Sequence, residues 1–347
     1  MRMTDTIHTE AVIVGAGPAG LFQIFELGLL GISAHIVDTL AQAGGQCTEL
    51  YPDKPIYDIP AQPVCGAQEL VDRLIEQAKP FNATYHLGQE VTEVKKLEDG
   101  RFHVATSAGT VFNAGAIVIA AGVGSFQPRR LSVPDIEKFE GSHVLYRVKS
   151  AADFHGKDLV ICGGGDSALD WTVALADKAR SLTLVHRRAE FRAAPATVAA
   201  MRELVAAHRV QLLEGNVVAL HPANGAHVEA EIHTADGSQV RKGAEHVIAF
   251  FGLHPKLGPV AEWGMELERK ALKVDTEKFQ TSVPGIFAIG DINSYPGKKK
   301  LILSGFHEAA LAAFAIQGHL FPGKRQFLQY TTTSPIMQKR LGVAGTE

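Results

Sequence analysis

Two glycine-rich segments constrain this sequence more than any other feature. The first, GAGPAG at residues 15–20, follows the apolar run 11–14, and the second, GGGDSA at residues 163–168, follows the apolar run 159–162. A helical pattern comes after each segment. Glycines between a strand and a helix let the backbone approach a pyrophosphate, whose charge is stabilised by the free N–H groups of the helix N-terminus. Each segment therefore predicts a dinucleotide-binding βαβ unit.

The two units differ in the polar residue at the end of their second predicted strand. In the first unit, Asp38 stands 23 residues after the first glycine; in the second, His186 stands at the same distance and is followed by Arg187 and Arg188. A carboxylate accepts hydrogen bonds from ribose hydroxyls and repels a 2′-phosphate, whereas an arginine pair attracts one. The first site is thus predicted to bind FAD and the second NADPH.

Length and composition narrow the class of protein. A chain of 347 residues has room for two domains with separate cores. The net charge of −3 argues against general nucleic-acid binding. The segment 1–10 is polar, unlike a signal peptide. The sequence also has no long charge-free apolar run of the kind that inserts into a membrane. We therefore expect a cytoplasmic protein. The cysteines Cys47, Cys65 and Cys162 form no Cys-x-x-Cys pair and predict neither a disulfide framework nor a metal site.

Alternating strand and helix signals predict an α/β protein with parallel sheets. Apolar strands ending in Gly122 and Gly252 bracket the second glycine-rich segment, which predicts that one domain is inserted into the other. We expect two Rossmann-like nucleotide-binding domains of the three-layer β/β/α type. The expected FAD-binding domain comprises residues 1–122 and 252–347, with a C-terminal extension at 326–347, and the expected NADPH-binding domain comprises residues 123–251.

Shorter patterns indicate elements around this frame. A helix is predicted over residues 67–78. Alternating runs at 91–97, 101–106 and 110–112 predict a small antiparallel meander packed on the parallel sheet. Residues 116–122 predict a further buried strand.

The motifs and their order resemble the two-dinucleotide-fold flavoprotein reductases, and among them the thioredoxin-reductase-like group. Ala120-Ala121-Gly122 is similar to the crossover segment of that family, and Gly290-Asp291 is similar to its second flavin motif, whose aspartate contacts the ribityl chain. The resemblance covers nearly the whole chain.

The redox cysteines that define disulfide reductases are missing. Thioredoxin reductases carry a Cys-x-x-Cys just before the second fingerprint, and the matching residues here, 146–149, contain no cysteine. The glutathione-reductase branch has a Cys-x4-Cys after the first βαβ unit, where Cys47 fills the first position but Pro52 fills the second. Without a resolving thiol, dithiol exchange cannot proceed in the usual way.

The chain is therefore similar to the thioredoxin-reductase-like ferredoxin–NADP(+) reductases. The loop 44–52, the cysteine-free segment 146–149 and the extension after residue 326 carry this resemblance. It implies that Tyr51 and Tyr330 stack on the two faces of the flavin and that the flavin itself is the reacting group. The implied FAD contacts are Gly15, Gly17, Pro18, Ala19, Gly20, Asp38, Gln46, Tyr51, Val91, Phe126, Asp291 and Thr332. The implied NADP contacts are Gly163, Gly164, Gly165, Asp166, Ser167, Ala168, His186, Arg187, Arg188 and Arg192.

The implied activity is FAD-mediated electron transfer between NADP(H) and ferredoxin or flavodoxin, in a homodimer. Because ferredoxins are acidic, a basic docking patch is expected, with residues 298–300 or 129–130 as candidates. Three alternatives remain open: an NADPH-dependent diaphorase that reduces quinones, iron chelates or oxygen, a disulfide reductase that uses another protein's thiols, and a nucleotide sensor without activity. Cys47 is also a candidate for a sulfenic acid.

Overall fold

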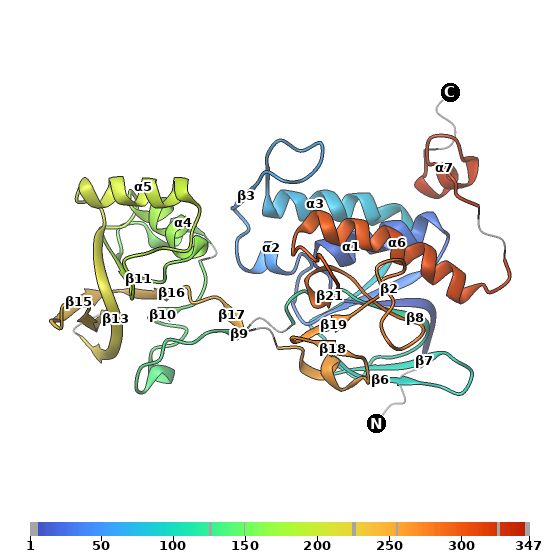
Figure 1. Cartoon of the computed structure of the whole chain (residues 1–347), viewed down its shortest axis with the longest axis horizontal. Coiled ribbons are helices and arrows are strands. Elements are labelled where there is room, and N and C mark those ends of the chain that lie inside the picture. The colour runs from blue at the N-terminus through green and yellow to red at the C-terminus, as the bar shows by residue number, and fades with distance from the viewer. Residues whose placement is uncertain are drawn as a thin grey trace. The chain divides into compact units, whose positions relative to one another are not determined.

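The computed structural model describes residues 6–124, 127–148, 150–223, 227–254, 256–324 and 327–343 (Figure 1). The chain divides into two compact units. Unit 1 comprises residues 1–126 and 255–347, and unit 2 comprises residues 127–254. Both are built on a mixed sheet, with a parallel part and an antiparallel meander, and on helices, so the predicted pair of Rossmann-like α/β domains, one inserted into the other, is confirmed.

Unit 1 is built on a sheet of order β5-β2-β1-β8-β7-β6, with β20 also paired to β8. Its strands are β1 (Ile7–Val14), β2 (Ala34–Asp38), β5 (Thr84–Leu87), β6 (Val91–Lys96), β7 (Phe102–Thr106), β8 (Val111–Ile119) and β20 (Ile286–Ala288). Its helices are α1 (Pro18–Leu29), α2 (Gln46–Glu49), α3 (Ala67–Ala78), α6 (Ile302–Leu320) and α7 (Pro335–Leu341). Shorter elements are β3 (Pro55–Ile56), β4 (Cys65–Gly66), β18 (Leu267–Glu268), β19 (Ala271–Lys273), β21 (Asn293–Ser294), and the 3-10 helices η1 (Lys79–Phe81), η4 (Gly258–Glu262) and η5 (Gly290–Ile292).

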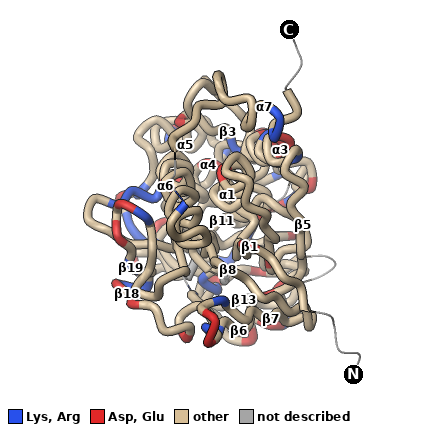
Figure 2. Tube along the Cα trace, turned by 90° about the vertical axis from the view of Figure 1, so that its right-hand side faces the viewer, with Lys and Arg blue, Asp and Glu red and all other residues tan. Residues whose placement is uncertain are grey.

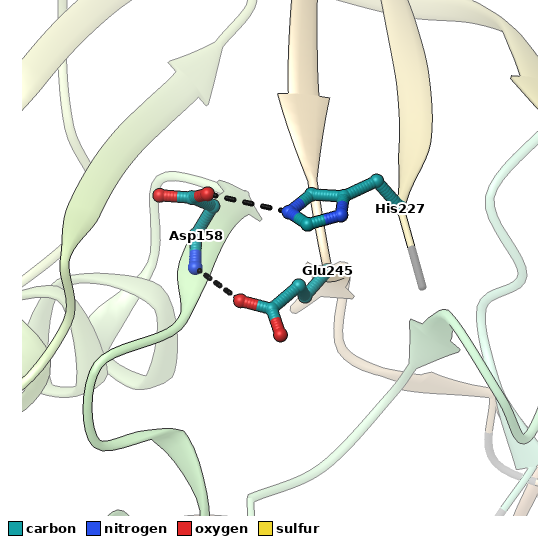
Figure 3. A group of neighbouring side chains, drawn as sticks. All are labelled: Asp158, His227 and Glu245. Carbon is teal, nitrogen blue, oxygen red and sulfur yellow. Dashed lines mark hydrogen bonds and ion pairs between the residues drawn. The ribbon is translucent and has the colours of Figure 1, made fainter. Parts of the chain in front are cut away.

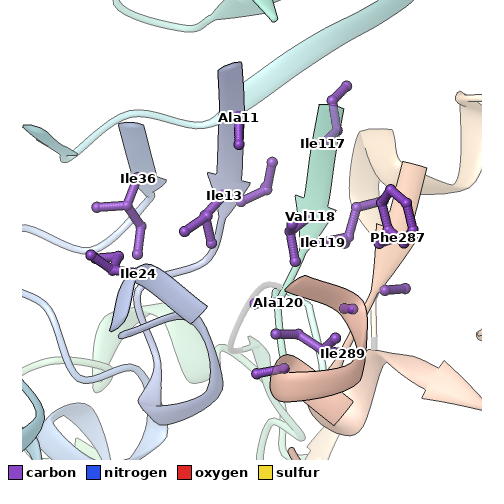
Figure 4. Close-up of a cluster of buried hydrophobic side chains, with 14 of the residues drawn as sticks. Ala11, Ile13, Ile24, Ile36, Ile117, Val118, Ile119, Ala120, Phe287 and Ile289 are labelled. Carbon is purple, nitrogen blue, oxygen red and sulfur yellow. The ribbon is translucent and has the colours of Figure 1, made fainter. Parts of the chain in front are cut away.

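The core of unit 1 lies between this sheet and the helices α1, α3 and α6. Ile13, Ile36, Ile117 and Phe287 come from four neighbouring strands and are fully buried (Figure 4). Such near-continuous apolar strands are typical of a parallel sheet buried on both faces. In register, Val14 of β1 pairs with the ends of β2 and β8, so the carboxyl ends of all three strands meet at one edge of the sheet.

Strand β8 differs from the sequence-based expectation. The runs 110–112 and 116–122 were expected to form separate strands, whereas the structure has one strand from Val111 to Ile119. Gly115 interrupts the apolar pattern without interrupting the strand, and a Cβ there would lie 2.5 Å from Leu320 Cδ2, so a side chain would meet α6. The meander is thus hydrogen-bonded to the parallel sheet through β8, whose first half pairs with β7 and whose second half pairs with β20.

Unit 2 repeats the arrangement in its own sheet, of order β10-β16-β11-β12-β13-β14-β15. The strands are β10 (Val144–Leu145), β11 (Asp158–Cys162), β12 (Ser181–His186), β13 (Gln211–Pro222), β14 (Val228–Thr234), β15 (Gln239–Ala244) and β16 (His246–Ala249), with the short pair β9 (Gln127–Pro128) and β17 (Leu253–His254). The helices are α4 (Asp166–Leu175) and α5 (Pro195–Ala206), with the 3-10 helices η2 (Ile136–Lys138) and η3 (Ala151–Phe154).

Charged side chains of both signs are interspersed along the chain. Around β18 and β19, for example, lysine and arginine are mixed with aspartate and glutamate, whereas β8 carries no charged residue (Figure 2). In the described part of the chain, no helix is both long enough and apolar enough to cross a membrane.

Candidate functional site

A cavity opens in unit 1 at the carboxyl ends of β1, β2 and β8, where parallel α/β sheets commonly bind their ligands. Its walls come from the first glycine-rich turn, the loop after β2, the end of β8, and the segments around η4 and η5. The residues predicted to contact FAD that line it are Gly15, Gly17, Pro18, Ala19, Asp38, Gln46, Tyr51, Val91 and Asp291.

The glycine-rich turn presents backbone to this cavity. Gly15 has a φ of +109°, and a Cβ on it would lie 2.4 Å from the Ala120 carbonyl oxygen, so only glycine fits between β1 and β8. Helix α1 begins at Pro18, and its N-cap residue Gly17 makes no side-chain capping bond. Gly17, Pro18 and Ala19 line the cavity at this helix N-terminus, whose uncapped N–H groups and positive dipole end suit a pyrophosphate.

Asp38 occupies the position expected of a ribose-binding carboxylate. It ends β2 with 9% of its surface exposed and lines the cavity. Its Oδ2 accepts a hydrogen bond of 2.6 Å from Ala16 N, and its Oδ1 accepts one of 2.8 Å from Leu40 N. Burial raises the pKa of the carboxyl, and the two backbone donors oppose that effect. Both oxygens retain lone pairs, so the carboxylate is held in place and still able to accept from a ligand hydroxyl.

The loop before α2 closes another wall. Gly44 N donates to Ala16 O at 2.8 Å, and a Cβ on Gly45 would lie 3.0 Å from Gly17 Cα, so this loop packs directly on the glycine-rich turn. Tyr51 lines the cavity, where burial and the nearby Cys47 thiol raise the pKa of its phenol. Burial also raises the pKa of Cys47 to about 11. A thiol that stays protonated is a poor nucleophile, which argues against the proposed sulfenic acid at Cys47.

The facing wall comes from the C-terminal half of unit 1. Gly290 and Asp291 follow β20 and line the cavity. Gly305, in the first turn of α6, lies so close to α1 that a Cβ on it would be 3.1 Å from Ala19 Cβ. Lys300, Leu301 and Ile302 continue this wall. With the backbone-lined turn, the ribose-type carboxylate and Asp291, the donors and acceptors present fit an adenine dinucleotide.

Four of the residues predicted to contact FAD are not among the residues that line this cavity. Gly20 does not line the cavity; a Cβ on it would lie 2.0 Å from Gly15 O, so it permits the close approach of α1 and β1. Tyr330 is 64% exposed and Thr332 is exposed, and neither lines this chain's cavity. Phe126 lies outside the described residues.

Unit 2 carries the second glycine-rich turn in matching geometry. Gly163 N donates to Val185 O at 3.0 Å, as Gly15 N donates to Val37 O at 2.8 Å in unit 1. A Cβ on Gly163 would lie 2.6 Å from Phe250 O, at the end of β16. Helix α4 begins at Asp166 without a side-chain cap on its N-cap residue Gly165. The same fold thus presents a second helix N-terminus suited to a phosphate.

The loop after β12 folds back over this turn. Arg192 N donates to Gly164 O at 2.7 Å, and Ala194 N donates to the Asp166 carboxylate at 2.9 Å. His186 stacks on Phe191, with ring centroids 5.0 Å apart, and its ring fills the space where a Gly164 Cβ would be. Arg187 and Arg188 follow in the same loop and are exposed. The structure therefore brings the predicted NADP contacts of unit 2 into one region; Ser167 and Ala168 lie in the first turn of α4.

A cluster of Asp158, His227 and Glu245 in unit 2 has the composition of a metal site (Figure 3). Its two carboxylates already form ion pairs within the protein. Asp158 is paired with Arg180, and Glu245 Oε1 lies 2.8 Å from Lys157 Nζ. Arg180 lowers the pKa of Asp158 to about 2. We interpret the cluster as an ion-pair network that ties β11 to β12 and to the residue before β16.

Several cavity residues were missed by the sequence analysis. Gly45 was named only within the loop 44–52 and Lys300 only within a docking patch, whereas Leu301, Ile302, Gly305 and the wall formed by Leu257, Pro259 and Val260 carry no fingerprint. The sequence did mark one residue that lies behind Gly290 and Asp291: Glu308 is the single carboxylate in the largely apolar helix α6.

Comparison with known proteins identifies the family of this chain. Residues 9–313 match the family model of the pyridine nucleotide-disulphide oxidoreductases. The chain belongs to that family. Among these oxidoreductases it is 60% identical over 337 residues to ferredoxin–NADP reductase 2 of Cupriavidus metallidurans, covering 97% of this chain and 92% of that protein. It is also 60% identical over 341 residues to a ferredoxin–NADP reductase of Methylibium petroleiphilum, covering 97% and 93%.

Among solved structures, this oxidoreductase is similar to the thioredoxin reductase of T. acidophilum. The TM-score is 0.75 at 24% sequence identity, over 89% of this chain and 97% of the other. At that identity the likeness concerns the fold. It agrees with the two-unit α/β architecture, and the recognition of a thioredoxin-reductase-like member of this family is confirmed.

Proposed function

We propose that this oxidoreductase is a ferredoxin–NADP(+) reductase that binds FAD in unit 1 and NADP(H) in unit 2. The observation that carries the proposal is the 60% identity, over nearly the whole chain, to relatives of that name. The cysteine pattern supports it against disulfide reduction: Cys47 is a buried thiol with a raised pKa, and burial in the core raises the pKa of Cys162 to about 12.

The residues of the chain bind and orient rather than transfer protons. In unit 1, the N–H groups of α1 would hold the pyrophosphate, Asp38 the ribose hydroxyls and Asp291 the ribityl chain. In unit 2, Arg187 and Arg188 would hold the 2′-phosphate. FAD, when bound, supplies the chemistry that links a two-electron donor to a one-electron acceptor. Tyr51, kept protonated by its burial, would stack on the ring system.

We further propose a cytoplasmic homodimer that serves ferredoxin or flavodoxin and in which the extension contributes Tyr330 and Thr332 to a flavin site. Helix α7 packs on α1 and η1, and Arg340 donates to Leu29 O at 2.5 Å, at the end of α1 remote from the cavity. The preceding residues are exposed, including Phe327, Leu328 and Tyr330. An exposed apolar segment beside an anchored helix favours a role in contact with a second copy of the chain.

An acidic carrier would dock where basic residues border the cavity. Lys299 and Lys300 are exposed, and Lys300 also lines the cavity. The expected patch at residues 298–300 needs correction, because the side chain of Lys298 is only 8% exposed and is paired with Glu308. Arg130 of the second candidate patch is also committed, to Glu137 and Glu140. The docking patch on unit 1 is thus proposed to contain Lys299 and Lys300.

The test is NADPH-driven reduction of cytochrome c by the purified protein, with and without ferredoxin, beside reduction of a disulfide dye. We expect a flavin absorption spectrum, strong dependence on ferredoxin that weakens with salt, and little dye reduction. Reduction that does not depend on ferredoxin would identify a general diaphorase instead. Sustained dye reduction would reject the proposal in favour of a disulfide reductase.

A further inference from the structure

Behind the wall formed by Gly290 and Asp291 lies a fully buried carboxylate that the proposed function does not use. Glu308 of α6 is 0% exposed. Its Oε2 accepts hydrogen bonds from Gly290 N at 2.7 Å and from Asn293 Nδ2 at 2.8 Å. Its Oε1 accepts from Tyr295 OH at 2.9 Å and from Lys298 Nζ. Each oxygen thus receives two donors.

Lys298 completes the arrangement from the other side. Its ammonium, in a side chain 8% exposed, also donates to the Gly290 carbonyl oxygen at 2.8 Å and lies 5.3 Å from the ring centroid of Tyr295. The Glu308–Lys298 pair therefore holds both the N–H and the C=O of Gly290. Because Gly290 has a φ of +75° and precedes Asp291, the pair fixes the backbone from which Asp291 extends.

The same pair connects two parts of the cavity wall. Lys298 comes two residues before Lys300, Leu301 and Ile302, which line the cavity next to Gly290 and Asp291. Through Lys298 and Gly290, one carboxylate of α6 thus ties the η5 segment to the segment that leads into α6. Burial and the bond to Glu308 raise the pKa of Tyr295 to about 12, which keeps its phenol a donor.

A buried ion pair seldom stabilises a fold more than apolar residues of similar volume would, because removing both charges from water is costly. Unlike apolar residues, the charged pair fixes the orientation of both peptide groups at Gly290 through directional hydrogen bonds.

We propose that Glu308 and Lys298 are positioning residues for the cofactor: they hold Gly290, Asp291 and the start of α6 in the arrangement that receives it. This inference rests on the proposed function, since it takes FAD as the ligand of unit 1. Neither residue lines the cavity, so both act through the backbone of residues that do.

The test compares E308Q with the wild-type holoenzyme. The glutamine amide has the shape of the carboxylate, but one of its two oxygens is replaced by an NH₂ group. That NH₂ group would face either the Gly290 N–H or the Lys298 ammonium, and neither can accept a hydrogen bond from it. We expect FAD binding, measured by titrating the apoprotein, to weaken at least about tenfold. We also expect the visible absorption and circular dichroism of the bound flavin to change, while NADP(+) binding to unit 2 stays as in the wild type.

A matched control is E245Q in unit 2, whose carboxylate is likewise ion-paired, with Lys157 and Arg180. It should lower thermal stability without changing FAD affinity or the flavin spectrum. Wild-type FAD affinity and spectrum in E308Q would overturn the proposal, and so would an equal loss of FAD in E245Q. If E308Q does not fold, K298Q is measured in the same way and decides in the same terms. Failure of the proposed function would show differently, as a wild-type protein that does not bind FAD or does not reduce ferredoxin.

Discussion

At the scale of single residues, the two nucleotide sites are distinguished by the side chains after their second strands. Asp38 is fixed by two backbone donors and faces the cavity of unit 1. At the matching place in unit 2, the ring of His186 stacks on Phe191, and exposed Arg187 and Arg188 follow. We expect the held carboxylate and the exposed arginine pair to select different nucleotides, since one repels a 2′-phosphate and the other attracts it.

Replacing Arg187 and Arg188 together by alanine should raise the KM for NADPH by about 10- to 100-fold, with a much smaller effect on kcat, because charge-assisted contacts to the 2′-phosphate act in binding. The KM for NADH should hardly change. Steady-state kinetics with both nucleotides measure this. Arg209→Ala, which removes a surface arginine of the same unit paired with Asp177, is the control. Equal losses with NADPH and NADH would contradict the assignment.

A pair of histidines in unit 1 is predicted to make stability depend on pH. His35 Nδ1 lies 2.9 Å from His86 Nε2, and the pKa of each is lowered by burial, that of His35 also by His86. Since the folded-state pKa lies below the unfolded value, the unfolded chain takes up protons first, and stability is lost as pH falls below about 6.5. We expect His86→Gln to reduce the drop in melting temperature between about pH 8 and about pH 5.5. An unchanged drop would assign that pH dependence to other groups.

At the scale of elements, the strand–turn–helix units show how closely α1 packs on β1. Gly20 allows the helix to approach Gly15 O, whereas the matching residue in unit 2 is Ala168, whose Cβ packs against Gly163. The two copies of one motif thus differ in their helix-to-turn distance, and the first tolerates no side chain at this position.

Gly20→Ala should therefore destabilise unit 1 by about 1–3 kcal/mol and weaken FAD binding, because the added methyl group forces α1 away from the turn. Thermal unfolding and FAD titration measure the two effects. Gly243→Ala is the control, since a Cβ there has no atom within 4 Å. If Gly20→Ala matched Gly243→Ala in both measurements, the close packing would have no role in the site.

The C-terminal element is predicted to affect hydride transfer. Removing the chain from Phe327 onward takes away Tyr330, Thr332 and α7, and should change the rate at which NADPH reduces the flavin in stopped-flow measurements. Tyr330→Ala should reproduce part of the change, and Tyr330→Phe, which keeps the ring, should not. Unchanged flavin reduction in the truncated protein would exclude a role for the extension at the flavin.

At the scale of the whole molecule, the chain is two compact units with separate cores, and we propose one nucleotide site in each. A ligand stabilises only the unit that binds it. We predict that calorimetry resolves transitions that respond separately: FAD raises the one that belongs to unit 1, and NADP(+) raises the other, each by up to about 3 kcal/mol at a ligand concentration of about 100 times Kd. A single transition that both ligands shift equally would contradict this independence.

Much of this organisation was predictable from local patterns. The helix at 67–78 was predicted with the bounds that the structure has, and the turns at residues 15–20 and 163–168 lie between strand and helix as expected. These features depend on neighbours in sequence: the apolar period, the glycines and the spacing to Asp38 or His186. Gly115 shows the limit, because the contact that leaves no room for a side chain there comes from Leu320, which is distant in sequence.

The sequence by itself thus determined the two dinucleotide folds and the order of the units, and it predicted a class of ligand for each. Only the tertiary structure decided which side chains are free to meet a ligand or partner. Lys298 looks like its neighbours Lys299 and Lys300 in the sequence but is buried against Glu308, and Tyr330 lies on the surface of its own chain. The physical reason is that burial and ion pairing depend on residues distant in sequence, which only the folded chain brings together.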